Sequence, residues 1–397
     1  MKKKICFVVQ RYGLEVNGGA ELHCRQLAEH LLRSGKDYDI SVLTSKAIDY
    51  MTWKDEYEGN EDINGIHVIR FSVTAPRKQA EFDSINGEFF EGRLSRARER
   101  EWIEKQGPAV PGLVQYLRDH KEDYDVFIFF TYLYYPTVLG VKEVADKAIV
   151  IPTAHDEPFL RMKIFDDVFK KPAGFFFNTD EERTLIHQKY GNQHILNDLG
   201  GVGVDLPETV CPERFKKKYG LDRYIIYVGR IDEGKNCHIL FDFFQEYKKR
   251  NKNDLKLVLA GKAVIPVPKH PDIISIGFVE DEDKFDGIAG AELLVLPSEF
   301  ESLSMVVLEA MSVNTAVLVN GKCPVLKGHC TKSNGALYYN GYYEFEGCIN
   351  YFMSHEEIKS VMVQNAKRYV EENYQWDVIV RRLDTMITQV MDRNGDK

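Results

Sequence analysis

The sequence predicts an α/β protein with two doubly wound domains. Short apolar runs rich in β-branched and aromatic residues recur along the chain, and helical patterns separate several of them. Such alternation is typical of parallel sheets covered by helices. The series of strands begins afresh near residue 224, and 397 residues suffice for two domains with cores of their own.

The expected strands fall into two series. The first comprises 5–9, 40–43, 67–71, 126–130, 148–151 and 174–177, with a helix expected over 20–32. The second comprises 224–228, 255–259, 273–276, 293–296, 316–319 and 336–339. A Gly-rich and Pro-containing segment between the series predicts a boundary, so we expect domains at 1–205 and 206–375. The last segment, 376–397, is expected to be a helix, and its return to the first domain stays open.

Composition narrows the functional class. The formal charge of −9 is spread over both halves, so no basic stripe for nucleic acid is visible. Seven cysteines without a Cys-x-x-Cys pair fit neither a disulfide framework nor a zinc site. The N-terminal apolar run is too short for a signal peptide, and no stretch approaches a membrane span. We therefore expect a cytoplasmic protein without nucleic-acid partners.

Two loops carry residues that suit an anionic ligand. Gly18 and Gly19 stand at the turn after the first strand, where backbone amides can approach an anion at a helix N-terminus. Gly229, Arg230 and Lys235 follow the first strand of the second series, and two cations there suit a diphosphate. For the glycines, a simple tight turn is the alternative. For the cations, the alternative is solvated loop charges.

Glu301 and Glu309 stand in the most informative stretch, 297–311. An apolar helix is expected from about Leu303, which places Glu301 in a loop and Glu309 within the helix. With the rise per residue of an α-helix, the eight-residue separation of the two glutamates corresponds to about 12 Å, enough to contact both ends of an extended sugar nucleotide. Alternatively, Glu309 only completes a polar network in an apolar helix. Amides at the start of this helix would face an anion or a sugar hydroxyl; they belong to Ser302, Leu303, Ser304 and Met305.

In combination, four motifs resemble the retaining GT-B glycosyltransferases of family GT4. They are Glu-x7-Glu from Glu301, Tyr-Val-Gly-Arg-x4-Lys ending at Lys235, Gly-Val-Asp at 203–205, and Gly-Phe-Val at 277–279 upstream of Leu-Pro-Ser at 296–298. Their order and spacing agree at all four places, and the resemblance covers essentially the whole chain. The resemblance implies the GT-B fold, in which two Rossmann-like domains face a central cleft.

The resemblance also implies roles for the matched residues. Arg230 and Lys235 would bind the donor diphosphate, Glu309 the ribose, and Glu301 the hydroxyls of the transferred sugar. His155 matches the position of the family's cleft histidine, although a histidine bonded into a loop is the alternative. The expected catalytic set is Arg230, Lys235, Glu301 and His155, and the expected donor-binding set is Gly18, Gly19, Gly229, Ser302, Leu303, Ser304, Met305 and Glu309.

The chain departs from the family at the donor loop. Where the family has Gly-Phe-Gly after the first glutamate, this chain has Ser302, Leu303 and Ser304. The identity of the donor sugar therefore cannot be inferred from the family. Asn320 and Lys327 lie in a further segment typical of GT4-like enzymes. Either residue is a candidate donor contact.

The acceptor side is expected in the first domain. Tyr132, Tyr134 and Tyr135 follow the strand 126–130, where rings can stack on a sugar. Core packing is the alternative. An amphipathic helix over 89–102 would suit a membrane or an anionic acceptor, the alternative being an ordinary surface helix.

These observations favour a metal-independent hexosyltransferase that needs no cofactor. Its donor would be a UDP- or GDP-linked sugar, and its acceptor a sugar, glycan or lipid-linked glycan, with peripheral attachment to the inner face of the membrane left open. Three Asp-x-Asp segments are rejected as metal sites, because Arg230 and Lys235 already supply positive charge at the diphosphate. The alternatives are a GT-B sugar-nucleotide epimerase and a non-catalytic sugar-nucleotide-binding subunit.

Overall fold

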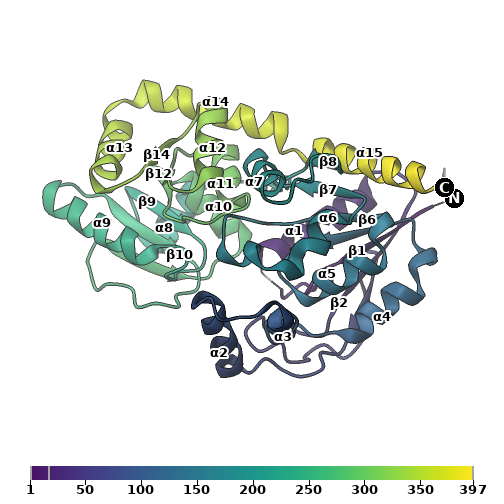
Figure 1. The fold of residues 1–397 in the computed structure, drawn as a ribbon. Helices are drawn as coiled ribbons and strands as arrows, with labels where there is room; N and C mark the ends of the chain where they lie inside the picture. The colour runs from purple at the N-terminus through teal and green to yellow at the C-terminus, as the bar shows by residue number, and fades with distance from the viewer. Residues whose placement is uncertain (1, 17, 396–397) are drawn as a thin grey trace. The chain divides into compact units, whose positions relative to one another are not determined.

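The computed structural model describes residues 2–16 and 18–395, which form two compact units. Unit 1 runs to Val202 and includes the chain from Ile379 onward, and unit 2 runs from Gly203 to Val378. Each unit is a largely parallel sheet with helices packed around it (Figure 1). The predicted α/β class with doubly wound sheets is confirmed.

The sheet of unit 1 has eight strands in the order β3-β4-β2-β1-β5-β6-β7-β8. All neighbours are parallel except β3 and β4. The strands are β1 (Lys3–Val8), β2 (Tyr38–Ser45), β3 (Glu61–Ile63), β4 (Ile66–Phe71), β5 (Val126–Phe130), β6 (Ala148–Ile151), β7 (Gly174–Phe177) and β8 (Leu196–Leu199). The two edge strands, β3 and β8, lack a continuous apolar run, and the sequence pattern did not reveal them.

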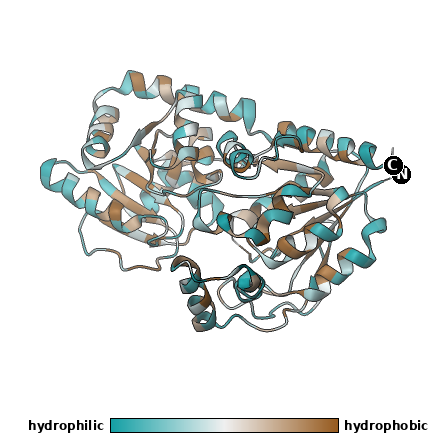
Figure 2. Ribbon diagram, viewed as in Figure 1, coloured by the Kyte–Doolittle hydropathy of each residue, from teal (hydrophilic) through white to brown (hydrophobic). Residues whose placement is uncertain are grey.

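Helices pack around this sheet. They are α1 (Gly19–Arg33), α2 (Gln79–Phe90), α3 (Glu99–Gln106), α4 (Pro111–Asp119), α5 (Tyr135–Gly140), α6 (Asp166–Lys170) and α7 (Asp180–Tyr190). Of these, α2 packs on α3 and not on the sheet itself. The central strands are buried on both faces, and Figure 2 shows them as the brown interior of the unit. Burial of these apolar side chains is the main force that holds the sheet and helices together.

The last helix, α15 (Trp376–Gly395), contributes most of its length to unit 1. Its buried face includes Leu383, Ile387 and Val390. Lys3 Nζ donates to Thr388 Oγ1 at 2.9 Å, and Arg382 donates to the Leu199 carbonyl at 3.2 Å. From Ile379 onward, the described part of α15 therefore packs within unit 1, which also contains β1.

The segment 89–102 is not the single amphipathic helix that the sequence predicted. Helix α2 ends at Phe90, a turn follows, and α3 begins at Glu99. Gly92 has φ of +71°, a left-handed conformation that cannot continue a right-handed helix. Phe89, Phe90 and Trp102 instead gather around Phe159 in aromatic contacts, with ring centroids 5.0–5.6 Å apart.

The sheet of unit 2 has six parallel strands in the order β11-β10-β9-β12-β13-β14. They are β9 (Tyr224–Val228), β10 (Lys256–Ala260), β11 (Ile273–Gly277), β12 (Leu293–Leu296), β13 (Val317–Asn320) and β14 (Leu337–Tyr339). The helices are α8 (Pro212–Tyr219), α9 (Cys237–Arg250), α10 (Asp281–Ala289), α11 (Met305–Ser312), α12 (Pro324–Ser333), α13 (Tyr342–Ser354) and α14 (Glu356–Asn373). All six predicted strands of this series are present, with ends within one residue of those expected.

Each sheet has one point where the strand order reverses. In unit 1 it lies between β1 and β5, and in unit 2 between β9 and β12. Open parallel sheets bind ligands outside the carboxyl ends of the strands at such a point. In unit 2 those ends lead directly into the segments that contain Arg230 and Glu301.

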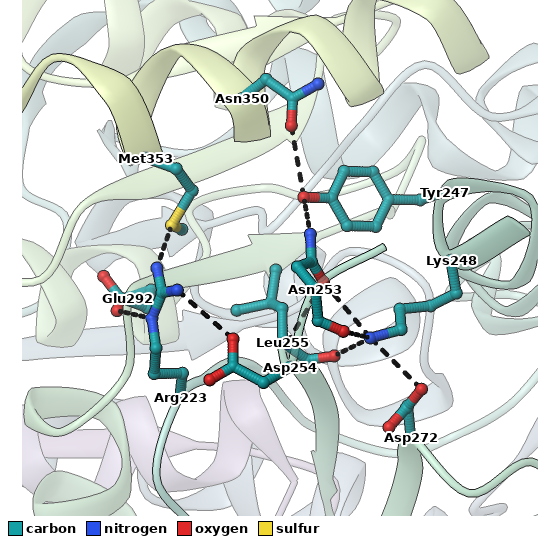
Figure 3. Close-up of polar contacts among 10 residues, drawn as sticks. All are labelled: Arg223, Tyr247, Lys248, Asn253, Asp254, Leu255, Asp272, Glu292, Asn350 and Met353. Atoms are coloured by element: carbon teal, nitrogen blue, oxygen red, sulfur yellow. Dashed lines mark hydrogen bonds and ion pairs between the residues drawn. The ribbon is translucent and has the colours of Figure 1, made fainter. Parts of the chain in front are cut away.

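The amino-terminal edge of the second sheet is closed by a polar network, which Figure 3 shows. Arg223, just before β9, donates to Glu292 at 3.1 Å and to Asp254 at 3.3 Å. Lys248 pairs with Asp272 at 3.2 Å and donates to the Leu255 carbonyl at 3.0 Å. These side chains pair with one another and with backbone groups where the strands begin. We therefore assign a structural role to this edge of the sheet.

Candidate functional site

The loop after β9 is shaped by two glycines. Gly229 has φ of +143° and Gly261 has φ of +150°. A Cβ atom on Gly261 would lie 1.9 Å from the Gly229 carbonyl oxygen, so only glycine permits this approach. The Gly229 amide donates to the Ala260 carbonyl at 2.9 Å. The backbone that leads into Arg230 is therefore fixed by its neighbour strand.

Arg230 and Lys235 share Asp232 as an organising residue. The Arg230 guanidinium pairs with one carboxylate oxygen of Asp232, and the Lys235 amide donates to the other at 2.8 Å. The Asp232 side chain is 12% exposed, whereas that of Arg230 is 48% exposed. The carboxylate thus ties the loop together, while the guanidinium remains accessible to a ligand.

Lys235 and Glu301 are brought into direct contact from the loops after β9 and β12. Lys235 Nζ lies 2.7 Å from Glu301 Oε1. Nearby, Asn236 donates to the Pro297 carbonyl at 3.3 Å, and Asn320 donates to the same oxygen at 2.9 Å. Three of the predicted donor-side residues, Lys235, Glu301 and Asn320, therefore meet at the carboxyl edge of neighbouring strands.

Helix α11 begins at Met305, two residues later than the sequence predicted. Ser304 has φ of +68° and ψ of +80°, so its left-handed backbone cannot belong to the helix. Glu301 lies in the loop and Glu309 in the helix, as predicted, but the expected length used the helical rise for residues that are not helical. Ser302 and Leu303 lie in the loop, and the Ser304 side chain does not cap α11.

Glu309 lies in α11 and contacts a cation that the sequence analysis missed. Lys284 Nζ, from α10, lies 2.8 Å from Glu309 Oε1 and 2.9 Å from Asp281 Oδ1. Both partners of the Glu309 pair are largely buried. Burial is the largest single influence and opposes the charged form of Lys284, but the Glu309 and Asp281 carboxylates together outweigh it and raise the pKa of the lysine. Lys327 was the second candidate donor contact beside Asn320. Its Nζ lies 5.0 Å from the centroid of the Tyr338 ring.

Gly18 and Gly19 lie at the start of α1, in unit 1. Gly18 is the N-cap, and a Cβ atom there would lie 2.1 Å from Glu21 Oε2. A Cβ atom at Gly19 would meet nothing within 4 Å. Glu21 forms a buried ion pair with Arg11 at 2.6 Å, which the sequence analysis did not single out.

His155 follows β6 in a loop that also carries Glu157. His155 Nδ1 lies 3.7 Å from Glu157 Oε1, and the same carboxylate accepts a hydrogen bond from Tyr132 at 2.5 Å. The His155 side chain is 31% exposed. Tyr132 is buried, and burial followed by the nearby Glu157 charge raises the pKa of its hydroxyl. The structure therefore brings His155 and Tyr132 to one carboxylate.

Glu182 holds this loop through hydrogen bonds to backbone amides. Its two carboxylate oxygens accept from the Ala154 amide at 2.6 Å and the Asn178 amide at 2.7 Å. Burial raises the pKa of Glu182 to about 8, and the two N–H bonds oppose that shift. The side chain links the segments that follow β6 and β7.

Tyr134 and Tyr135 contact neighbours other than those of Tyr132. The Tyr134 ring meets the Trp53 ring edge-on, with centroids 5.7 Å apart. Tyr135 borders a pocket of about 590 Å³ in unit 1 that Trp53, Arg77 and Arg100 also line. The pocket draws on segments that follow β2, β4 and β5, so it lies on the carboxyl side of the first sheet.

Two further properties of the described chain bear on its chemistry. Within residues 2–16 and 18–395, no three His, Cys, Asp or Glu side chains are grouped as a metal site requires. None of the helices in those ranges is long and apolar enough to cross a lipid bilayer.

Comparison with known proteins identifies related sequences and folds. Residues 213–369 match the family described as "Glycosyl transferases group 1". The uncharacterized glycosyltransferase MJ1607 of Methanocaldococcus jannaschii is 21% identical over 426 aligned positions, which cover 99% of this chain and 100% of the relative.

Two solved structures match the whole chain. Sucrose-phosphate synthase from Thermosynechococcus elongatus has a TM-score of 0.72 at 14% identity, covering 99% of this chain and 100% of that one. Anabaena Alr3699/HepE in complex with UDP-glucose has a TM-score of 0.68 at 15% identity, with the same coverage. The chain therefore has the GT-B fold, as predicted, and these findings together support a GT-B glycosyltransferase.

Proposed function

We propose that this protein is a retaining, metal-independent hexosyltransferase of the GT4 type. It moves a sugar from a nucleotide-diphosphate donor to a sugar, glycan or lipid-linked glycan acceptor and needs no cofactor. The observation that carries the proposal is the contact between Lys235 and Glu301 beside Arg230, at the reversal point of the second sheet. We further propose that the protein works in the cytoplasm.

The paired lysine and glutamate match the chemistry of a sugar nucleotide. In such a donor, the sugar is bonded directly to the distal phosphate, so a cation for the phosphate and a carboxylate for the sugar hydroxyls must be neighbours. Lys235 and Glu301 are neighbours at 2.7 Å. Glu309 would accept a hydrogen bond from the ribose while Lys284 holds its other side.

Transfer breaks the bond between the anomeric carbon and the diphosphate oxygen. Negative charge then grows on the departing diphosphate, and Arg230 and Lys235 would stabilise it more strongly than in the bound donor. The acceptor hydroxyl forms the new bond to the anomeric carbon, and its proton would pass to the departing diphosphate oxygen. Glu301 would stabilise the positive charge that develops on the sugar ring.

Unit 1 would hold the acceptor. His155 with Glu157, and the pocket beside Tyr135, supply an imidazole, carboxylates and rings, which are the groups that bind sugar hydroxyls and faces. Gly18 and Gly19 would line the donor side of this unit. The acidic and basic side chains of the pocket suit a polar acceptor better than an apolar one.

A donor panel tests the proposal. UDP-, GDP- and ADP-sugars are screened for a rise in Tm, because a ligand that binds the native state stabilises it. UDP-glucose comes first, because Anabaena Alr3699/HepE was solved with it. The stabilising donor is then incubated with glycan acceptors, and proton NMR of the product should show the donor's anomeric configuration.

The same panel separates the alternatives. An epimerase would change the donor's sugar without an acceptor, and a non-catalytic subunit would bind donor without consuming it. Transfer with inversion would contradict the GT4 assignment. A wild-type protein that binds no sugar nucleotide would contradict the proposal as a whole.

A further inference from the structure

Ser304 adopts a conformation that serine rarely holds. Its φ of +68° lies in the left-handed region, where a Cβ atom is strained and glycine is not. The residue is buried, and no described residue gives its Oγ a hydrogen-bond partner. Its own side chain therefore does not hold the turn, and a strained backbone persists only where its surroundings impose it.

A buried histidine on another helix supplies that constraint. His329 of α12 is 2% exposed, and its Nε2 lies 2.7 Å from the carbonyl oxygen of Leu303, the residue before Ser304. A carbonyl can only accept a hydrogen bond, so Nε2 carries the proton. His329 thus holds the peptide group that leads into the strained residue.

Two tyrosines fix this tautomer. His329 Nδ1 lies 3.1 Å from the Tyr369 hydroxyl, which lies 3.2 Å from the Tyr374 hydroxyl. With the proton on Nε2, a neutral ring has an acceptor at Nδ1, so Tyr369 donates to it and Tyr374 donates to Tyr369. The hydrogen bonds therefore run in one direction. They begin at Tyr374, pass through Tyr369 of α14 and then His329, and end at the loop beside Glu301.

We propose that His329 is a positioning residue of the donor site. By holding the Leu303 carbonyl, it keeps Ser304 left-handed and so sets the path of the loop between Glu301 and helix α11. The inference rests on the proposed function for the identity of the ligand. The coupling between His329 and Ser304 does not, because it follows from the contacts of these two residues. A glycine at 304 would adopt the same backbone unaided and should make His329 dispensable.

A rescue experiment tests this coupling. His329→Phe removes the donor and keeps a ring, whereas His329→Gln can still donate to the carbonyl. Ser304→Gly removes the strain. Binding of UDP and GDP is measured by titration calorimetry, and hydrogen exchange of the segment 300–306 is measured by mass spectrometry.

We expect His329→Phe to weaken nucleotide binding about 10-fold or more and to speed exchange of the segment, because the turn loses its constraint. The double variant with Ser304→Gly should return to within about 3-fold of wild type, a coupling that independent sites do not show. Ser304→Gly alone, which keeps the backbone amide, is the reference for the double variant. His329→Gln should lose less binding than His329→Phe, because it still donates to the carbonyl. If His329→Phe does not fold, Tyr369→Phe removes one hydroxyl and should give a smaller loss that Ser304→Gly also rescues.

Purely additive effects, or unchanged exchange in His329→Phe, would overturn the inference. If the wild type binds neither nucleotide, the proposed function is contradicted, while the exchange data still decide the role of His329. Rescue of exchange without rescue of binding would show that the loop is held by His329 but is not part of the donor site, and would also overturn the proposal.

Discussion

Lys235 Nζ and Glu301 Oε1 lie 2.7 Å apart, although 66 residues separate them in the chain. Their side chains are 33% and 14% exposed, so the pair is reachable from solvent and not locked in the core. A diphosphate that binds Lys235 must compete with Glu301 or share the cation with it. The contact therefore links occupancy of the phosphate site to the freedom of the carboxylate.

Removal of either predicted diphosphate cation should impair transfer. We expect Arg230→Ala and Lys235→Ala each to lower kcat/KM by about 100-fold or more, the size seen when a preorganised electrostatic group is lost. Steady-state kinetics with the donor from the Tm panel measures this effect. Circular dichroism should show that both variants stay folded.

Lys322 offers a matched control for this experiment. It pairs with Glu299 at 3.4 Å and is more exposed, at 60%. Lys322→Ala should change kcat/KM by less than about 3-fold, because exposed ion pairs contribute little. Wild-type rates in Arg230→Ala or Lys235→Ala would show that these cations are ordinary loop charges.

The two glutamates should differ in the kinetic parameter that they affect. Glu309 is placed at the ribose, away from the breaking bond, so Glu309→Gln should mainly raise KM. Glu301 is placed at the ring that becomes positive in the transition state, so Glu301→Gln should lower kcat by about 10–1,000-fold. Initial rates with donor varied at saturating acceptor separate the two effects.

Glu309→Gln also alters the surroundings of Lys284, so stability must be measured beside activity. Asp281 remains 2.9 Å from the lysine in that variant, which limits the loss. Glu299→Gln is the conservative control on the same loop. If Glu301→Gln changes only KM while Glu309→Gln abolishes kcat, the two assignments are reversed.

Activity should not depend on a divalent ion. Arg230 and Lys235 supply the positive charge that a metal supplies in other transferases. Transfer measured after dialysis against EDTA should equal the untreated rate, with Mg²⁺ and Mn²⁺ added back in parallel samples. Loss on chelation with recovery on addition of a metal would contradict the proposed role of the two cations.

Strand prediction succeeded where burial left a clear pattern. Val126–Phe130 is apolar throughout and buried on both faces, and its limits were predicted to the residue. Edge strand β8, with the sequence Leu-Asn-Asp-Leu, is half-buried and has no such run. The predicted helix ends were wrong at Gly92 and Ser304, which both have positive φ. A Cβ atom at Gly92 would meet nothing within 4 Å, and a glycine is itself a local signal for a helix end. Ser304 is not a glycine, so its left-handed backbone depends on its surroundings.

Motif spacing singled out Lys235, Glu301 and Glu309 as candidates, but it did not indicate the residues that contact the glutamates or their loop. Lys284 reaches Glu309 across 25 residues, and His329 reaches the Leu303 carbonyl across 26. Neither separation follows a helical or strand period, so no pattern in one sequence marks it. Glu182 was missed because backbone amides hold its carboxylate, and every residue but proline has an amide, so the sequence does not mark such a partner.

His23 should make unit 1 sensitive to acid. It lies in α1 at 4% exposure, with its ring edge-on to Phe130 at 5.1 Å, and burial lowers its pKa to about 4. An unfolded histidine titrates near 6.5, so between these values the unfolded chain binds the extra proton and the free energy of unfolding falls as the pH falls. From pH 6.5 to 4 the loss is about 3 kcal/mol.

Urea unfolding at pH 7.0 and 4.5 checks this prediction, followed by tryptophan fluorescence, since Trp53 and Trp102 both lie in unit 1. Other carboxylates also titrate in this range, so the relevant quantity is the difference between wild type and His23→Leu. Relative to wild type, the free energy of unfolding of His23→Leu should be higher at pH 4.5 than at pH 7.0. His194 is exposed, so His194→Leu should keep the pH dependence of the wild type. Parallel pH curves for wild type and His23→Leu would mean that His23 is protonated in the folded state, and would refute the proposed origin of the acid sensitivity.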